Sequence, residues 1–313
     1  MKNLLVIVGP TAVGKTSLSV ELAEHYGGEI ISADSMQIYR GMDIGTAKIK
    51  ADEMKSIPHY LLDVVAPDEE FSVSDFKEMT YACLGDVYSR EKLPLIVGGT
   101  GLYVNSIVYK LDFADSGSDM EVRKKYMDCA EEFGNEYIYE KLKEVDPETA
   151  ERLNLNDTKR IVRALEVYEL TGEPMSKSYT NFREENDEFN LVFIGLDMER
   201  SHLYERINER VDIMLENGLV EEVKSLLENG YNSDMTSMKA IGYKEVVEYL
   251  RGVTTYDEMV EILKRNSRRF AKRQLTWFRR DKRIVWMQVD DYESLEELKR
   301  EAISICDKKL REG

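Results

Sequence analysis

A short motif near the start of the chain contains the residue types that bind a phosphate chain. Residues 9–16 read Gly-Pro-Thr-Ala-Val-Gly-Lys-Thr, directly after an aliphatic run and directly before a helical pattern over Lys15–Tyr26. In such a loop, glycines let backbone amides turn toward phosphate, the lysine adds positive charge, and the Thr16 hydroxyl can bind Mg²⁺. We therefore predict a phosphate-binding loop made of Gly9, Pro10, Thr11, Ala12, Val13, Gly14, Lys15 and Thr16.

A carboxylate lies at the end of the second predicted strand, which covers residues 29–34. The carboxyl ends of parallel strands meet at one edge of a sheet, where ligands of open α/β folds bind. Asp34 is therefore a candidate general base or substrate hydrogen-bond acceptor. The structural alternative is that Asp34 caps a helix.

The third predicted strand, residues 93–97, is not followed by an acid. It runs into Gly98, Gly99 and Thr100, whereas nucleotide hydrolases hold Mg²⁺ with a carboxylate on the corresponding strand. This absence favours group transfer over nucleotide hydrolysis. Thr100 is a candidate polar contact beside the phosphates.

Basic residues are concentrated near the end of an acidic chain. The chain has a formal net charge of −17 at pH 7. The segment 264–283 nevertheless contains a single acid, Asp281, among the bases Lys264, Arg265, Arg268, Arg269, Lys272, Arg273, Arg279, Arg280, Lys282 and Arg283. Many are spaced by one helical turn and can follow a phosphate backbone, although a charged helix face is often merely solvated. The pattern predicts an anionic polymer as partner.

Two smaller basic groups lie on other predicted helices. Lys159, Arg160 and Arg163 begin one of them. Arg206 and Arg210 are four residues apart on another, where they could bind an anion or form salt bridges with Glu205 and Glu209.

The elements that must position these residues indicate an α/β fold. Strands alternate with helices in the first third of the chain, which predicts a doubly wound parallel sheet of the P-loop NTPase type. From about residue 115 to 190 the pattern is helical and acidic. We expect a core of residues 1–114 and 191–313, interrupted by a helical insertion domain over 115–190. Predicted helices of the core include Tyr256–Phe278, and those of the insertion include Met120–Phe133.

Composition narrows the function classes. Hydrophobic residues make up 42% and charged residues 33% of the chain, which is typical of globular proteins and not of disordered ones. No apolar run reaches the roughly 18 residues that span a bilayer, so we expect no membrane association. Three widely spaced cysteines and three histidines predict neither a disulfide framework nor a zinc site, which favours the cytoplasm. No segment suggests oligomerisation, so we expect a monomer.

Together these motifs resemble the bacterial tRNA dimethylallyltransferases, also called tRNA isopentenyltransferases. The matching segments occur in the family's order over nearly the whole chain. They are residues 9–16, 34–39, 41–48, 58–63, 98–103, 156–157, 159–167, 240–243 and 272–279.

The resemblance implies transfer of a dimethylallyl group from dimethylallyl diphosphate to N6 of adenosine 37, next to the anticodon of tRNAs that read codons beginning with U. The phosphate loop would hold the diphosphate of the donor, with Mg²⁺ near Thr16. Asp34 would take the proton of the exocyclic amine, while Thr100 and Arg210 would contact the leaving diphosphate. The helical insertion would close on the anticodon stem-loop.

The resemblance also implies a set of tRNA contacts. These are Asp34, Ser35, Met36, Gln37, Thr100, Arg123, Lys159, Arg160, Ile161, Val162, Arg163, Lys239, Ala240, Ile241, Gly242, Tyr243, Lys244, Lys272, Arg273, Gln274, Leu275, Thr276, Trp277, Phe278 and Arg279.

Three other functions are compatible with parts of the pattern. The chain could prenylate free adenine nucleotides, although that reaction would not need the basic segments. It could be a P-loop kinase for a small metabolite, with Asp34 as the base. It could also be an RNA-binding module without catalytic activity.

Overall fold

The chain folds into two compact units, each described here by itself. The computed structural model describes residues 1–111, 117, 119–178 and 184–312. One unit contains Met1–Val108 and Asp187–Gly313, and the other is Tyr109–Asn186. The sequence placed the insertion at 115–190. In the structure Tyr109 already pairs with Glu185, and the Lys110 amide donates to the Glu184 carbonyl at 2.8 Å, so the second unit begins earlier.

The first unit is built on a parallel sheet of six strands in the order β3-β2-β4-β1-β5-β6. The strands are β1 (Lys2–Val8), β2 (Glu29–Ala33), β3 (His59–Tyr60), β4 (Pro94–Gly98), β5 (Phe189–Asp197) and β6 (Val285–Gln288). The predicted α/β fold class is therefore confirmed. Strands β2, β4 and β1 are adjacent, which brings the ends that precede Asp34, Thr100 and the phosphate loop to one edge.

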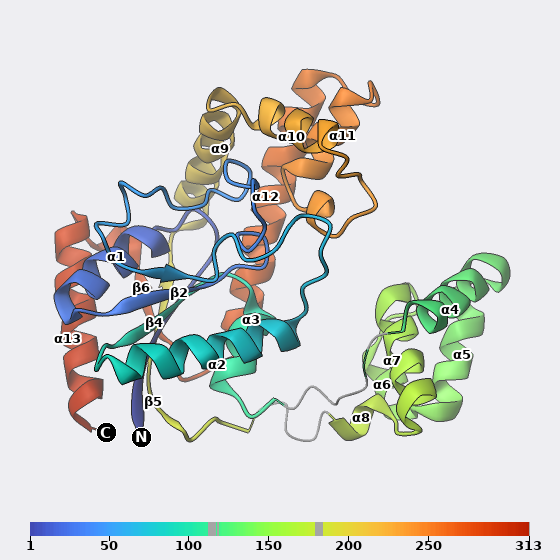
Figure 1. Cartoon of the computed structure of the whole chain (residues 1–313), viewed down its shortest axis with the longest axis horizontal. Coiled ribbons are helices and arrows are strands. Elements are labelled where there is room, and N and C mark those ends of the chain that lie inside the picture. Colours follow the sequence, from blue (N-terminus) through green and yellow to red (C-terminus); the bar gives the residue numbers. More distant parts are fainter. Residues whose placement is uncertain (112–116, 118, 179–183, 313) are drawn as a thin grey trace. The chain divides into compact units, whose positions relative to one another are not determined.

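Helices cover both faces of this sheet, as Figure 1 shows. Helices α1 (Lys15–Tyr26) and α13 (Leu295–Glu312) pack on one face, and α2 (Val73–Ser89) and α3 (Gly101–Val108) lie on the other. Leu5 and Ile7 of β1 pack in the α1 and α13 core, so the alternate residues of that strand point to the opposite face. Burial on both faces explains the continuous aliphatic runs of the strands.

A helical layer extends the first unit beyond the carboxyl end of the sheet (Figure 1). It consists of α9 (Arg200–Glu216), α10 (Leu219–Glu228), the 3-10 turn η1 (Ser237–Lys239), α11 (Tyr243–Leu250) and α12 (Tyr256–Phe278). The loop after β2 joins this layer because Ile38, Tyr39 and Met42 pack against buried residues of α9 to α11. Helix α12 begins at a capping box between Thr255 and Glu258.

The second unit is entirely helical apart from the Tyr109–Glu185 pairing, among the residues described for it. Its helices are α4 (Met120–Phe133), α5 (Asn135–Val145), α6 (Pro147–Arg152), α7 (Thr158–Thr171) and α8 (Met175–Ser178). Ile138, Leu142, Ile161 and Leu165 form its core. It therefore has a hydrophobic core separate from that of the sheet.

The sequence left several elements unassigned. Strand β3 has two residues, too few for a periodic pattern. Helix α3 is buried along most of its length and so lacks an amphipathic signal. Helices α6, α8 and α13 and the 3-10 turns η1 and η2 (Val289–Asp291) were also not predicted. No helix within the described ranges is long and apolar enough to cross a membrane.

Candidate active site

The predicted catalytic elements surround one cavity at the carboxyl edge of the sheet. The cavity has a volume of about 430 Å³ and is lined by residues of the phosphate loop, the Asp34 turn and helices α9 and α12. Lys15 and Thr16 border it, as do Asp34 and Arg210. The sequence prediction therefore placed side chains together that are up to 195 positions apart in the chain.

The backbone of the phosphate loop depends on its two glycines. Gly9 has φ +150°, and a Cβ there would lie 2.6 Å from the Leu196 carbonyl oxygen. Gly14 has φ +105°, a left-handed conformation that side chains disfavour. The loop curls around the Lys15 ammonium, which donates to the carbonyls of Gly9 at 3.0 Å and Pro10 at 2.7 Å. Lys15 is thus held at the floor of the loop.

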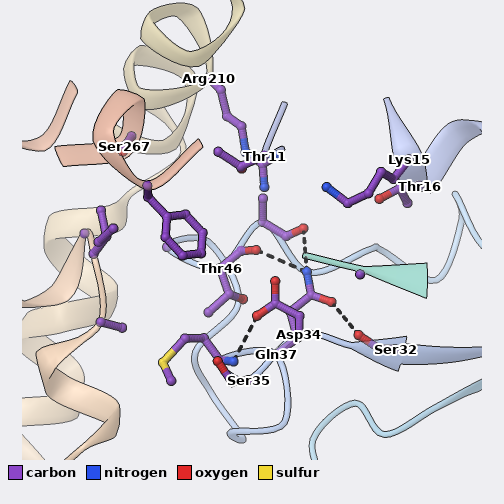
Figure 2. A pocket seen from close by; sticks show the side chains of 18 of the residues that line it. Thr11, Lys15, Thr16, Ser32, Asp34, Ser35, Gln37, Thr46, Arg210 and Ser267 are labelled. Atoms are coloured by element: carbon purple, nitrogen blue, oxygen red, sulfur yellow. Dashed lines mark hydrogen bonds between the residues drawn. The ribbon is translucent and has the colours of Figure 1, made fainter. Parts of the chain in front are cut away.

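Two buried cations face one carboxylate in this cavity. In Figure 2 the side chains of Lys15 and Arg210 enter the cavity from different sides, and the carboxylate of Asp34 lies below them. Burial, together with the positive charge of Arg210 and against the opposing charge of Asp34, lowers the pKa of Lys15 to about 7. Burial likewise lowers the pKa of Arg210. Within the described chain Arg210 forms no ion pair, so the site has cationic capacity for an anionic ligand.

A hydrogen-bonded turn orients Asp34. Its Oδ1 accepts a hydrogen bond from the Met36 amide at 2.9 Å. The preceding amide, that of Ser35, donates to Thr100 Oγ1 at 3.0 Å. Thr100 is not among the residues that line the cavity. In this structure it therefore supports the Asp34 turn, and its contact with diphosphate stays a prediction.

Gln37 and Met36 border the cavity on the same loop. The Gln37 side chain accepts from the Ser32 hydroxyl at 3.1 Å and donates to the Thr46 carbonyl at 3.2 Å, as drawn in Figure 2. These bonds fix the amide on the cavity wall.

Sequence analysis missed Glu222, which joins two walls of the cavity. Its carboxylate accepts from the backbone amides of Asp43, Ile44 and Gly45 at 2.8 to 3.1 Å and from the Tyr243 hydroxyl at 2.7 Å. Gly45 packs so closely that a Cβ would lie 2.5 Å from the Tyr243 ring. Three of the four donors are backbone groups, which leave no side-chain signal in a sequence.

A second cavity approaches the phosphate loop from another side. It has a volume of about 340 Å³ and shares Lys15, Thr16 and Arg210 with the first. Arg206 lines it, and within the described part of the chain Arg206 makes no salt bridge with Glu205 or Glu209. Of the two roles that the sequence left open, anion binding is therefore favoured.

Helix α12 divides the basic segment between two faces. Arg265, Arg269, Lys272 and Thr276 are exposed and follow the helical repeat along one face. Arg273 lines the cavity. Four bases have protein partners: Lys264 pairs with Asp212, Arg283 pairs with Asp281, Arg279 pairs at 2.6 Å with the buried Asp197, and Arg268 donates to the Asn208 side chain at 2.6 Å. We call the exposed face that carries Arg265, Arg269 and Lys272 the basic face.

Several residues predicted to contact tRNA have buried side chains. Phe278 and Gln274 are on the inner side of α12, and Tyr243 is fully buried beneath Gly45. Ile161 and Val162 belong to the core of the second unit. These five side chains are buried in the protein, although Gln274 also lines the cavity, and their contact with tRNA stays a prediction.

The other predicted tRNA contacts lie at the cavity, in the second unit and on α12. Lys239, Ala240, Ile241, Gly242 and Lys244 line the cavity. In the second unit Lys159 and Arg160 are exposed, whereas Arg123 and Arg163 hold the buried Glu166 at 2.9 and 2.7 Å. Leu275 is partly buried in the sheet core, and Trp277 packs against Gly101.

Comparison with known proteins assigns the chain to a family. The family model described as IPP transferase matches residues 37–281. The chain belongs to the IPP transferase family. It is 52% identical over 298 residues to the tRNA dimethylallyltransferase of Acetivibrio thermocellus, with 95% of each chain covered.

Two solved structures of this family are similar. The full-length tRNA isopentenylpyrophosphate transferase of Bacillus halodurans is 43% identical, covers 99% of each chain and has a TM-score of 0.72. A eukaryotic dimethylallyltransferase acting on tRNA is 30% identical and has a TM-score of 0.86, over all of this chain and 80% of that one. The resemblance seen in the sequence is therefore confirmed at the level of the family.

The residues around Thr16 fit a magnesium ion that is bound mainly through a diphosphate. Thr16 is exposed at the mouth of the loop and its hydroxyl makes no hydrogen bond within the described chain. Among the described residues, no three His, Cys, Asp or Glu side chains lie together as a metal site. Mg²⁺ accepts few protein ligands when phosphate oxygens and water complete its shell.

The lowered pKa of Lys15 predicts pH-dependent anion binding. A diphosphate beside the ammonium favours its charged form and raises its pKa above the value of about 7 in the empty site. Binding then takes up a proton at higher pH, so affinity falls as pH rises. We expect a loss of about tenfold per pH unit between roughly pH 7.5 and 9, measured by calorimetric titration with inorganic diphosphate.

Titration of Lys15→Met over the same pH range corrects for the ionisation of diphosphate itself. We expect the affinity of the wild-type protein for diphosphate to fall more steeply with pH than that of the variant. Parallel pH profiles for the two proteins would contradict the role assigned to Lys15.

Proposed function

We propose that this IPP transferase moves a dimethylallyl group from dimethylallyl diphosphate to N6 of the adenosine next to the anticodon in tRNAs that read codons beginning with U. The observation that carries the proposal is one carboxylate, Asp34, facing two buried cations, Lys15 and Arg210, across a single cavity. A carboxylate can take a proton while the cations hold a departing anion. The related enzymes from Acetivibrio thermocellus and Bacillus halodurans are named for this class of transfer to tRNA.

The reaction forms a bond between adenine N6 and the first carbon of the dimethylallyl group and breaks the bond from that carbon to the diphosphate oxygen. Asp34 accepts the proton that N6 loses, since an aromatic amine is a poor nucleophile without a base. Negative charge grows on the leaving diphosphate. Lys15, Arg210 and the amides of the phosphate loop stabilise that charge most strongly in the transition state.

Thr16 would hold Mg²⁺, which would supply further positive charge to the diphosphate. Thr100 is proposed to reach the same diphosphate from the neighbouring turn. We also propose that Met36 and Gln37 hold the adenine, which has to leave its base stack to reach the cavity.

The basic face of α12 is proposed to bind the phosphate backbone of the tRNA, together with Lys239 and Lys244 at the mouth of the cavity. Lys159 and Arg160 would let the second unit contact the anticodon stem-loop. We further propose that the enzyme works as a monomer in the cytoplasm. Its three cysteines are free, which suits a reducing compartment.

Replacement of Asp34 tests the catalytic assignment. Asp34→Asn keeps the acceptor for the Met36 amide but removes the charge that takes the proton. We expect kcat to fall by about 10²- to 10⁴-fold, with tRNA affinity unchanged, measured as prenylated adenosine formed on unmodified tRNA. Asp52→Asn, on an exposed loop, is the matched control and should retain full activity. Full activity of Asp34→Asn would exclude Asp34 as the base.

The basic face is tested by salt-dependent binding. Arg269→Ala and Lys272→Ala should each weaken tRNA binding and make log K less steep in log[salt] by about one unit, because each removes one phosphate contact. Lys308→Ala removes an exposed charge from α13 and should change neither. Arg279 is unsuitable because its loss would strand the buried Asp197 carboxylate. Unchanged slopes would make the basic face a solvated surface.

A further inference from the structure

The buried amide of Gln274 connects three segments of the active site. It lies on the inner side of α12 and is 5% exposed. Its Oε1 accepts from the Thr11 amide of the phosphate loop at 2.9 Å, and its Nε2 donates to the Gly99 carbonyl at 3.0 Å. One side chain thus bridges the loops that follow β1 and β4.

Gly99 is needed for this bridge. A Cβ at that position would lie 2.1 Å from Gln274 Nε2, closer than atoms can pack. The turn continues into Thr100, whose hydroxyl accepts from the Ser35 amide beside Asp34. A chain of hydrogen bonds therefore runs from the phosphate loop through Gln274 and the Gly99 turn to the segment that carries the proposed base.

We propose that Gln274 is a positioning residue that sets the phosphate loop against the Asp34 turn, so that the diphosphate and the base are held at a fixed separation. The inference builds on the proposed function, because it takes the loop to be the diphosphate site. It differs from the role that the resemblance implies for residues 272–279, where Gln274 would contact tRNA. Its hydrogen bonds to the phosphate loop and to the Gly99 turn make it part of the donor site.

The same helix provides a matched comparison. Lys272 lies two residues away but on the exposed basic face. Loss of the Gln274 amide leaves the Thr11 amide and the Gly99 carbonyl without their partner and frees the loop. Loss of the Lys272 charge leaves the loop untouched. The two substitutions should therefore affect different substrates.

The experiment measures the binding of inorganic diphosphate and of tRNA separately for Gln274→Met and Lys272→Met. For Gln274→Met we expect diphosphate affinity to fall about tenfold, the scale of one lost buried hydrogen bond, with tRNA affinity retained. For Lys272→Met we expect the reverse. In turnover, Gln274→Met should raise the KM for dimethylallyl diphosphate but not the KM for tRNA. A general loss of folded protein would lower the amount of active enzyme and leave both KM values unchanged.

The outcomes separate this inference from the proposed function. If wild-type protein does not bind diphosphate, the proposed function fails. If it binds and Gln274→Met binds equally well, or loses tRNA instead, the positioning role is overturned. Should Gln274→Met not fold, Gln274→Glu keeps the acceptor for Thr11 and removes the donor to Gly99. It must weaken diphosphate binding for the inference to hold.

Discussion

Two cations buried beside one carboxylate are the constraint on which the rest of the site depends. Lys15 and Arg210 are both shifted toward their neutral forms by burial, and Asp34 is the one acid that opposes the shift for each of them. Such an arrangement costs stability in the empty protein and favours an anionic ligand. In the proposed reaction diphosphate would be that anion, and because it departs during the reaction its stabilisation would also lower the barrier. The fold places these three groups around one cavity.

The architecture meets this demand with backbone and amide contacts from several elements. Adjacent parallel strands bring the phosphate loop, the Gly99–Thr100 turn and the Asp34 turn to one edge. Gln274 connects the phosphate loop and the Gly99 turn to α12, and Glu222 connects residues 43–45 to α10. Both connecting residues bond mainly to backbone groups, so they fix loop geometry without taking part in the chemistry.

The sequence predicted those elements whose local residue pattern is enough to determine the backbone conformation. The turn between β1 and α1, the start of α1 and the full extent of α12 follow from glycine spacing and helical periodicity. The sequence motif over 272–279 did not distinguish the two faces of the helix: Gln274 and Phe278 are buried, whereas Lys272 is exposed. Glu222 could not be found at all, since its partners are backbone amides far along the chain.

The most direct test of the account is the mass of the product. Unmodified tRNA with adenosines after its anticodon is incubated with the protein, Mg²⁺ and dimethylallyl diphosphate, then digested to nucleosides and weighed. The account predicts an adenosine heavier by one dimethylallyl group, with diphosphate released. Unmodified adenosine throughout, together with ATP consumption in the presence of small alcohols, would contradict it and assign the phosphate loop to a kinase.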